Sequence, residues 1–338
     1  MNSASFTPIR FPASTRPQLH VVVDTEEEFD WNAPFSRANT SVRAIRHIHR
    51  LQSILDRFRL RPTYVVDYPI ASQADGVAPL KEIADSGLAH IGAHLHPWVS
   101  PPFVEELSGP NSFGCRLGRQ VEFDKIRILR DQIVTSFGSA PRAFKAGRYG
   151  FGPSTASILE ELGFTIDLSV NPRMNYLAIG GPTFEAFDAQ PFTFGRSRRL
   201  LEVPCTTDYI GVAGPLSATV HRFASAPSLQ AFRLQGICAR LGIVNKVMLS
   251  PEGSTLDEMK ALARTLLGRG VRTFSFTLHS PSVEPGCTPY VRNAGDLERF
   301  LGTITAFCEF FVTEMNGVPG TPDDYLASLP AADAAATH

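Results

Sequence analysis

Short apolar runs rich in β-branched residues alternate with longer segments of helical periodicity along most of this chain. The strand-like runs are residues 19–24, 62–68, 88–94, 142–147, 165–170, 200–205 and 271–279. The helical segments, with an apolar residue at every third or fourth position, are 41–59, 79–86, 123–137, 153–162, 255–267 and 294–315. Such alternation is typical of βαβ units around a parallel sheet. The sequence therefore predicts an α/β fold, and its 338 residues fit one α/β barrel.

The ends of the chain differ in composition from this alternating part. Residues 1–18 are rich in Ser, Thr, Pro and Arg and lack the apolar stretch of a secretory signal, so we expect an N-terminal extension. Residues 19–318 form the predicted barrel domain. Residues 319–338 end in small residues and are predicted to be a disordered tail. Within the domain, 99–120 and 171–199 interrupt the alternation and are expected to be substrate loops.

Charge and cysteine content exclude several classes of protein. The 32 Lys and Arg residues balance 33 Asp and Glu residues, which argues against binding to nucleic acid or to an acidic membrane surface. No apolar run approaches the roughly 20 residues of a membrane span. The five cysteines are odd in number, widely spaced and without a Cys-x-x-Cys pair, so neither disulfides nor a cysteine zinc site is expected. We predict a cytoplasmic protein, and the sequence carries no indication of its oligomeric state.

Two of the predicted strands end in residues of the types that commonly bind metals. In VVVDTEEEFDW, side chains two positions apart share a face of an extended chain, so Asp24 and Glu26 can meet. In HIGAHLHPW, His94 and His96 project the same way, and neutral imidazole is the commonest nitrogen ligand of divalent metals. Taken singly, an acidic solvated loop and a pair of core histidines are the alternative interpretations.

Two further strands end in ionisable residues. AFKAGRYGFG places Arg148 just past one strand, and FSFTLHSPS places His279 at the end of another. The C-terminal ends of all barrel strands open on the same face, where catalytic residues from several strands meet. The sequence therefore predicts one site. Two imidazoles and one carboxylate leave metal positions open for water and substrate, which favours Zn²⁺, with Co²⁺ or Ni²⁺ as alternatives.

The motifs resemble those of the NodB-homology polysaccharide deacetylases, carbohydrate esterase family four, over residues 19–301. The resemblance implies a distorted barrel of seven or eight β/α units that hydrolyses the N-acetyl group of an amino sugar. DTE looks like the family's base and metal-binding acid, which implies Asp24 as general base and Glu26 as ligand. AHLHP is similar to the motif with two metal-binding histidines, His94 and His96, and TLHS to the motif of the catalytic acid, His279.

Other family elements match less closely. Lys145 stands where the family has the Arg that orients the base, so this role is expected to pass to Arg148. FTIDLSV is similar to an element that shapes the substrate groove, which implies Asp167 as a substrate-binding residue. The family usually has Asp where Glu26 stands and a spacing of four between its histidines. If Asp24 were the third ligand, the base would be Glu26 or Glu28. SPEGSTLDEM and TLHSPSVEPG resemble a subgroup linked to the biosynthesis of surface polysaccharide and lipopolysaccharide.

Aromatic residues accompany these motifs. Trp31, Trp98 and Tyr149 lie in the motif loops and are predicted to stack on sugar rings, with packing at the barrel rim as the alternative. The sequence thus predicts a metal-dependent deacetylase whose partner is an N-acetylated carbohydrate. Two alternatives stay open: a small-molecule amidohydrolase on the same barrel, and a carbohydrate-binding homologue without activity.

Overall fold

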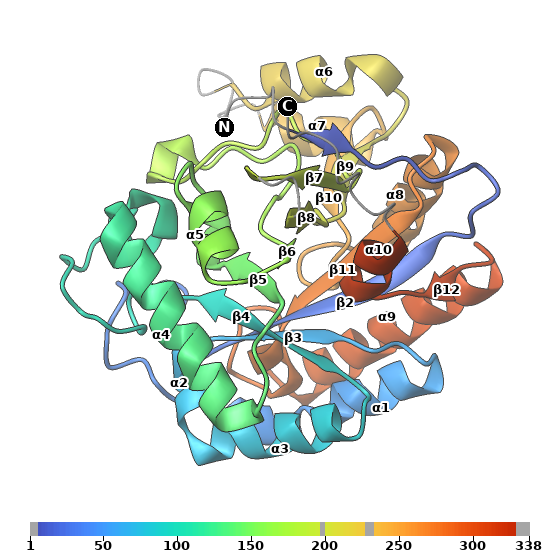
Figure 1. Ribbon diagram of the computed structural model, residues 1–338. Helices are drawn as coiled ribbons and strands as arrows, with labels where there is room; N and C mark the ends of the chain where they lie inside the picture. Colours follow the sequence, from blue (N-terminus) through green and yellow to red (C-terminus); the bar gives the residue numbers. More distant parts are fainter. Residues whose placement is uncertain (1–5, 197–199, 227–232, 329–338) are drawn as a thin grey trace, which may run out of the picture.

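A parallel sheet runs through the centre of the molecule. The computed structural model describes residues 6–196, 200–226 and 233–328, and it has ten strands in one sheet, in the order β1-β7-β8-β6-β5-β4-β3-β2-β11, with β12 also paired to β2 (Figure 1). The strands of this sheet are β1 (Thr7–Pro8), β2 (Gln18–Thr25), β3 (Thr63–Val66), β4 (His90–Leu95), β5 (Ala143–Ala146), β6 (Ile166–Asp167), β7 (Phe192–Phe194), β8 (Leu200–Glu202), β11 (Thr273–His279) and β12 (Val318–Pro319).

All seven predicted strands are present, and they pair in parallel from β8 to β11. This confirms the α/β class with a parallel sheet. β1 and β7 add an antiparallel edge, and β9 (Thr207–Ile210) with β10 (Asn245–Met248) forms a separate hairpin. The strand pairing is an open path, so within the described ranges no strand pair closes the predicted barrel between β11 and β8. The hairpin reaches β11 through one backbone bond, from Thr277 N to Leu249 O at 3.1 Å.

Helices surround the sheet and the β9–β10 hairpin (Figure 1). They are α1 (His49–Arg57), α2 (Tyr68–Ser72), α3 (Ala74–Asp85), α4 (Arg119–Phe137), α5 (Thr155–Glu161), α6 (Ser217–Ala224), α7 (Leu234–Arg240), α8 (Leu256–Gly268), α9 (Ala294–Thr313) and α10 (Pro322–Ser328). Each predicted helix corresponds to one of these, and the predicted segment 79–86 proves to be the second half of α3, with Pro79 inside the helix. The helices α2, α6, α7 and α10 were not predicted.

The strands bury side chains on both faces, which explains why they read as continuous apolar runs. In β2, Val21 and Val23 pack with the helices in the larger apolar cluster, whereas Val22 points to the opposite face. There Val22 meets Val65 and other strand residues in a smaller cluster. The ends of the strands are therefore held rigidly from two sides, and a functional side chain at a strand end has a fixed position.

The C-terminal segment corrects the prediction of a disordered tail. Within 319–328, β12 pairs with β2, α10 follows, and Tyr325 is buried in the smaller cluster beside His20. The buried ring, the bonds between Thr321 and Asp324 and the ion pair of Asp323 with Arg142 hold this short segment, although the surrounding composition suggested disorder. The predicted tail beyond Ser328 lies outside the described residues.

Two features of composition can be compared directly with the structure. All five cysteines are free thiols, as predicted. No helix in the described part of the chain has the length and apolar character needed to cross a bilayer.

Candidate active site

A cavity of about 560 Å³ lies at the C-terminal ends of β2, β4, β5 and β11. Parallel pairing brings these ends together: Asp24 of β2 stands next to His279 of β11, and His94 of β4 stands next to Lys145 of β5. All four side chains line the cavity together with Glu26 and His96. The strand-end residues that we predicted to share one site do share one cavity.

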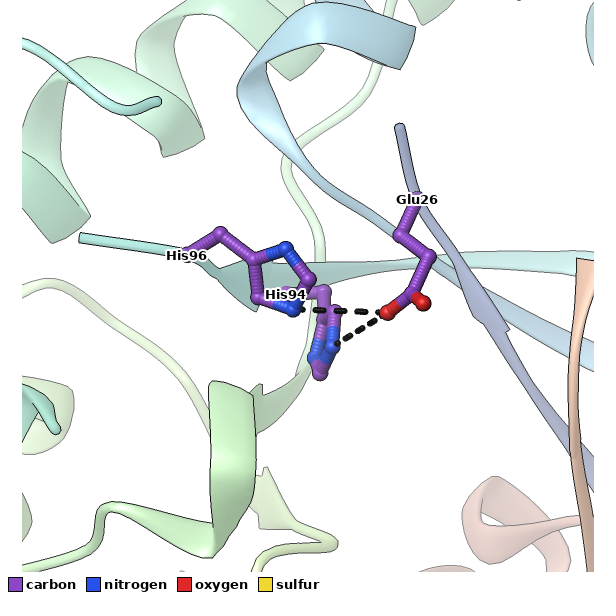
Figure 2. Close-up of side chains that lie close together, drawn as sticks. All are labelled: Glu26, His94 and His96. Carbon is purple, nitrogen blue, oxygen red and sulfur yellow. Dashed lines mark ion pairs between the residues drawn. The ribbon is translucent and has the colours of Figure 1, made fainter. Parts of the chain in front are cut away.

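Glu26, His94 and His96 form a compact group of metal-ligand type. One donor atom from each lies within 4.8 Å of the others, and all three residues are buried. Figure 2 shows the two rings and the carboxylate pointing toward a common point. Glu26 Oε2 is 3.6 Å from His94 Nε2 and 3.3 Å from His96 Nε2. Donors that bind a tetrahedral Zn²⁺ at about 2.0–2.1 Å lie about 3.3 Å apart, so the spacing fits one ion.

The second ring nitrogen of each histidine is held from behind. His94 Nδ1 donates to Lys145 O at 3.0 Å, and His96 Nδ1 donates to Glu27 Oε2 at 2.8 Å. Burial lowers the pKa of His96, which keeps its imidazole neutral. With a proton on Nδ1, each ring leaves the lone pair of Nε2 free to face Glu26.

Glu27, which binds the back of His96, is itself held by several contacts. Its side chain is fully buried, its Oε1 accepts from Trp98 Nε1 at 2.7 Å, and its backbone N–H donates to Asp67 Oδ2 at 2.7 Å. Asp67 is the N-cap of α2 and accepts from Ile70 N at 2.8 Å. Burial raises the pKa of Glu27 to about 8, with a smaller contribution from Glu26, and burial together with the nearby Glu27 raises the pKa of Asp67. A carboxyl group that binds the back of a ligand histidine fixes the orientation of its ring.

Asp24 lies beside this group and is paired with a lysine. Lys145 Nζ is 2.6 Å from Asp24 Oδ1 and 2.7 Å from Oδ2. Burial alone would raise the pKa of Asp24, but Lys145, His94 and His279 outweigh it and lower the pKa to about 2. Asp24 is therefore an anion at neutral pH, with its orientation set by Lys145.

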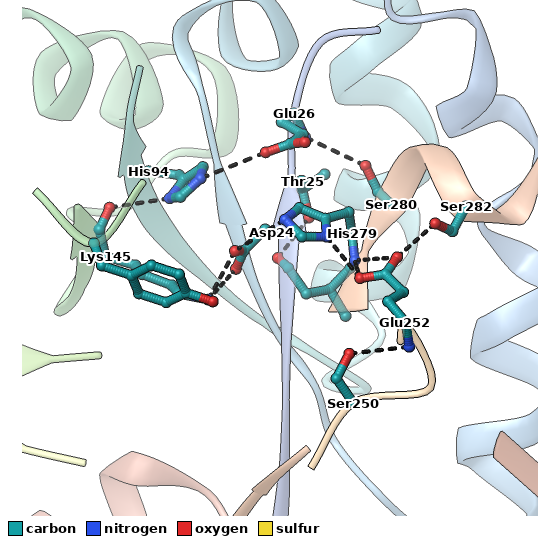
Figure 3. A network of polar contacts seen from close by, with 12 residues as sticks. Asp24, Thr25, Glu26, His94, Lys145, Ser250, Glu252, His279, Ser280 and Ser282 are labelled. Atoms are coloured by element: carbon teal, nitrogen blue, oxygen red, sulfur yellow. Dashed lines mark hydrogen bonds and ion pairs between the residues drawn. The ribbon is translucent and has the colours of Figure 1, made fainter. Parts of the chain in front are cut away.

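His279 faces Asp24 from the opposite side. Its Nε2 is 3.7 Å from Asp24 Oδ2, and its Nδ1 is 2.6 Å from Glu252 Oε2 (Figure 3). Glu252 also accepts from the backbone N–H of His279. Burial works against protonation, but Glu252, Glu26 and Asp24 raise the pKa of His279 to about 10. This imidazole is therefore protonated at neutral pH, with its Nε2 toward Asp24.

Two predicted assignments need correction. Arg148 lines the cavity but does not orient Asp24; its guanidinium binds Ser112 Oγ, and Lys145 takes the predicted role. Lys145 is on the inward face of β5 because it is two positions from Ala143, whereas Arg148 lies past the end of the strand. Asp167 is fully buried, accepts from Ser169 Oγ at 2.6 Å and does not line the cavity, so it cannot touch substrate there.

The predicted aromatic residues line the cavity in different ways. Trp31 is half-buried, and its ring lies edge-to-face against His279 at 5.0 Å between centroids. Tyr149 is stacked on Tyr176 at 5.6 Å. Trp98 is 1% exposed and stacked on His96 at 4.2 Å, and its indole N–H is used by Glu27. This position favours a supporting role for Trp98 over the sugar-stacking role that we predicted.

Sequence reasoning missed Glu27 and Glu252 as parts of the site. Glu27 lies in the acidic run after β2, on the face opposite to Glu26, and alternation alone cannot show that a histidine lies behind it. Glu252 follows β10, a strand that was not predicted. Its signal was the motif SPEGSTLDEM, which pointed only to a subgroup and to no residue role.

No family model matches the sequence, and no curated protein matches it significantly. Solved structures do resemble it. Puue allantoinase is 15% identical, with 95% of this chain and 93% of that chain covered and a TM-score of 0.53. A Mycobacterium smegmatis protein assigned as a polysaccharide deacetylase is 15% identical, with 93% and 96% covered and a TM-score of 0.46. A chitin deacetylase from Colletotrichum lindemuthianum is 16% identical, with 48% and 58% covered and a TM-score of 0.31.

At these identities the likeness concerns the fold. The chain has the α/β architecture of the solved allantoinase over nearly the whole length of both proteins. Carbohydrate deacetylases also occur among the similar structures.

Proposed function

We propose that this chain is a metal-dependent hydrolase of the NodB-homology type that removes the N-acetyl group of an amino sugar in a polysaccharide or glycolipid precursor. The observation that carries the proposal is the convergence of Glu26, His94 and His96 on one point beside Asp24 and His279. Zn²⁺ fits the two imidazoles and one carboxylate, and Co²⁺ or Ni²⁺ would fit the same donors.

The residues around the donors divide the remaining chemistry between them. A divalent ion held by the three donors would polarise the acetyl carbonyl and activate water for attack on it. Asp24, ionised and oriented by Lys145, accepts the proton of the attacking water. His279, protonated and held by Glu252, donates its proton to the departing nitrogen, which is a poor leaving group without it.

The aromatic wall of the cavity supports a sugar as substrate. Trp31 and Tyr290 lie edge-to-face with ring centroids 5.6 Å apart, next to His279, and both line the cavity. Aromatic rings at this place offer apolar area for the face of a sugar ring close to the proton donor. The predicted cytoplasmic location would suit a precursor better than a finished polymer.

A small-molecule amidohydrolase is the second candidate. A cavity of about 560 Å³ is within the usual range for small ligands, about 300–1,000 Å³. The donors and the acid–base pair would serve any linear or cyclic amide that fits.

The experiment that separates these functions combines metal analysis with product detection. The purified protein is analysed for bound metal, and acetate release is then measured with N-acetylated oligosaccharides, N-acetylated monosaccharides, simple N-acyl compounds and cyclic amides. We expect bound metal and acetate release from the carbohydrates that is lost with a chelator. Turnover of only the simple or cyclic amides would select the second candidate, and metal-free protein that binds glycans without turnover would contradict both.

A further inference from the structure

The ionisable groups of the cavity wall are unevenly paired. Each of the three carboxylates has a partner: Asp24 binds Lys145, Glu252 binds His279, and Glu26 faces the two ligand imidazoles. Arg148 and Lys246 line the same cavity, and neither makes an ion pair with a carboxylate of the described residues. Among the described residues this positive charge has no ion-pair partner, although Glu185 acts on Lys246 from a greater distance, and a bound divalent cation would add to the charge.

Arg148 is built into the wall and is not a free surface side chain. Its guanidinium is half-buried, lies over the ring of Phe113 at 4.1 Å and over that of Phe35 at 5.0 Å, and donates to Ser112 Oγ and, at 3.4 Å, to Gly109 O. A guanidinium held by its faces and by one edge keeps its remaining N–H groups in a fixed direction. Five donors in a planar fork match the two oxygens of a carboxylate or phosphate.

The backbone at Arg148 is strained, and the surrounding residues hold it in this conformation. Arg148 has φ 54° and ψ 23°, and Tyr149 has φ 60°, so two successive non-glycine residues are left-handed. Each costs about 1–3 kcal/mol, and such strain persists where neighbours over-determine it. The flanking glycines supply that constraint: a Cβ on Gly147 would collide with Leu95 O, and one on Gly150 would lie 2.8 Å from Gly114 N. The turn thus holds Arg148 in a fixed place on the wall.

We propose that Arg148 is an anion-recognition residue, and that the substrate carries a carboxylate or phosphate group in addition to its N-acyl group. The proposal deepens the proposed function and rests on it for the identity of the N-acyl group. Anion recognition takes the place of the base-orienting role that we predicted for Arg148, because Lys145 fills that role. Lys246 adds a second positive charge to the same wall.

Three related ligands test the proposal: neutral N-acetylglucosamine, N-acetylglucosamine 6-phosphate and N-acetylmuramic acid, which carries a carboxylate. Their dissociation constants are measured by calorimetry with the protein as purified, and acetate release is measured separately. We expect at least one anionic ligand to bind about 10- to 100-fold more tightly than the neutral sugar, the range of a charge-assisted hydrogen-bond pair. The ligand that gains identifies carboxylate or phosphate as the group.

Variants assign the preference to Arg148. In Arg148→Gln the ratio of neutral to anionic dissociation constants should fall to within about threefold of unity, and Arg148→Lys, which keeps the charge without the fork, should give an intermediate ratio. Arg264→Gln is the matched control, because Arg264 also stacks on a phenylalanine ring, at 4.8 Å from Phe310, but is exposed outside the cavity. This control should keep the wild-type ratio.

Three results would overturn the proposal: no anionic ligand binds more tightly than N-acetylglucosamine, Arg148→Gln keeps the wild-type ratio, or Arg264→Gln loses it. Retention of the ratio in Arg148→Gln would place the anion elsewhere on the wall. Binding is measured apart from acetate release, so a failure of the deacetylase proposal alone gives a different result. The protein would then still bind the anionic ligand more tightly through Arg148 but would release no acetate.

Discussion

Replacing Glu27 by glutamine tests the support of His96 without removing a metal ligand. The bond from His96 Nδ1 to Glu27 Oε2 is 2.8 Å long and fully buried, and the same carboxylate also accepts from Trp98. Glutamine has a single acceptor oxygen for these two donors. A buried hydrogen bond that orients a ligand histidine typically contributes about 10- to 100-fold to metal affinity. We expect Glu27→Gln to bind Zn²⁺ more weakly by this factor.

The assay is competition for Zn²⁺ with a chromophoric chelator, together with urea unfolding of the metal-free protein to separate affinity from stability. Glu28→Gln is the matched control, because Glu28 lies in the same acidic run but accepts from Ser41 and Ala44 on the other side of the chain. Wild-type affinity in Glu27→Gln, or an equal loss in Glu28→Gln, would refute the reasoning.

Three further predictions concern the acid, the ligands and the turn beside them. His94→Ala should lower Zn²⁺ affinity by more than about 100-fold, whereas His279→Ala should keep the metal and lower kcat by about 10²- to 10⁴-fold. The same chelator assay measures the metal affinity of both variants, and an equal loss in both would contradict the assignment. Glu252→Gln removes the largest of the three charges that raise the pKa of His279. His279 must be protonated to act, so the alkaline limb of the kcat/KM profile should move to lower pH, and an unmoved limb would exclude His279 as the acid. Gly147→Ala should lower the free energy of unfolding by about 1–3 kcal/mol, because its Cβ would meet Leu95 O; unchanged urea unfolding would show that the turn can relax.

The parallel sheet could be predicted because its strands are buried on both faces and therefore appear as unbroken apolar runs. The small strands could not. In β10, Asn245–Met248, two of the four residues are polar, and among the described strands it pairs only with β9, in a hairpin beside the main sheet. Missing β10 meant that Glu252, which follows it, had no predicted place in the site.

The alternation of side chains along β5 could have identified Lys145 as the basic residue beside Asp24. Lys145 is two positions from Ala143, which packs in the smaller inward cluster, so the lysine side chain enters the same side of the sheet as Asp24. Arg148 lies past the strand, where period-two reasoning ends. Spacing likewise placed Asp24, Glu26, His94 and His96 together, but could not show that Glu27 lies behind His96 or that Asp167 is enclosed in the core.

The neighbours of β2 determine when the pocket can form during synthesis of the chain. Asp24 and Glu26 come early in the chain, but β2 is flanked on one side by β11, and Ser275 of β11 contacts His20 across 255 residues of sequence. A nascent chain that ends before β11 has its acidic residues on a strand with one open edge and lacks His279. Pairs so distant in sequence form slowly, because a long loop must close before they gain any contact. The pocket can therefore be completed only after synthesis has passed His279, and truncation before β11 should abolish it.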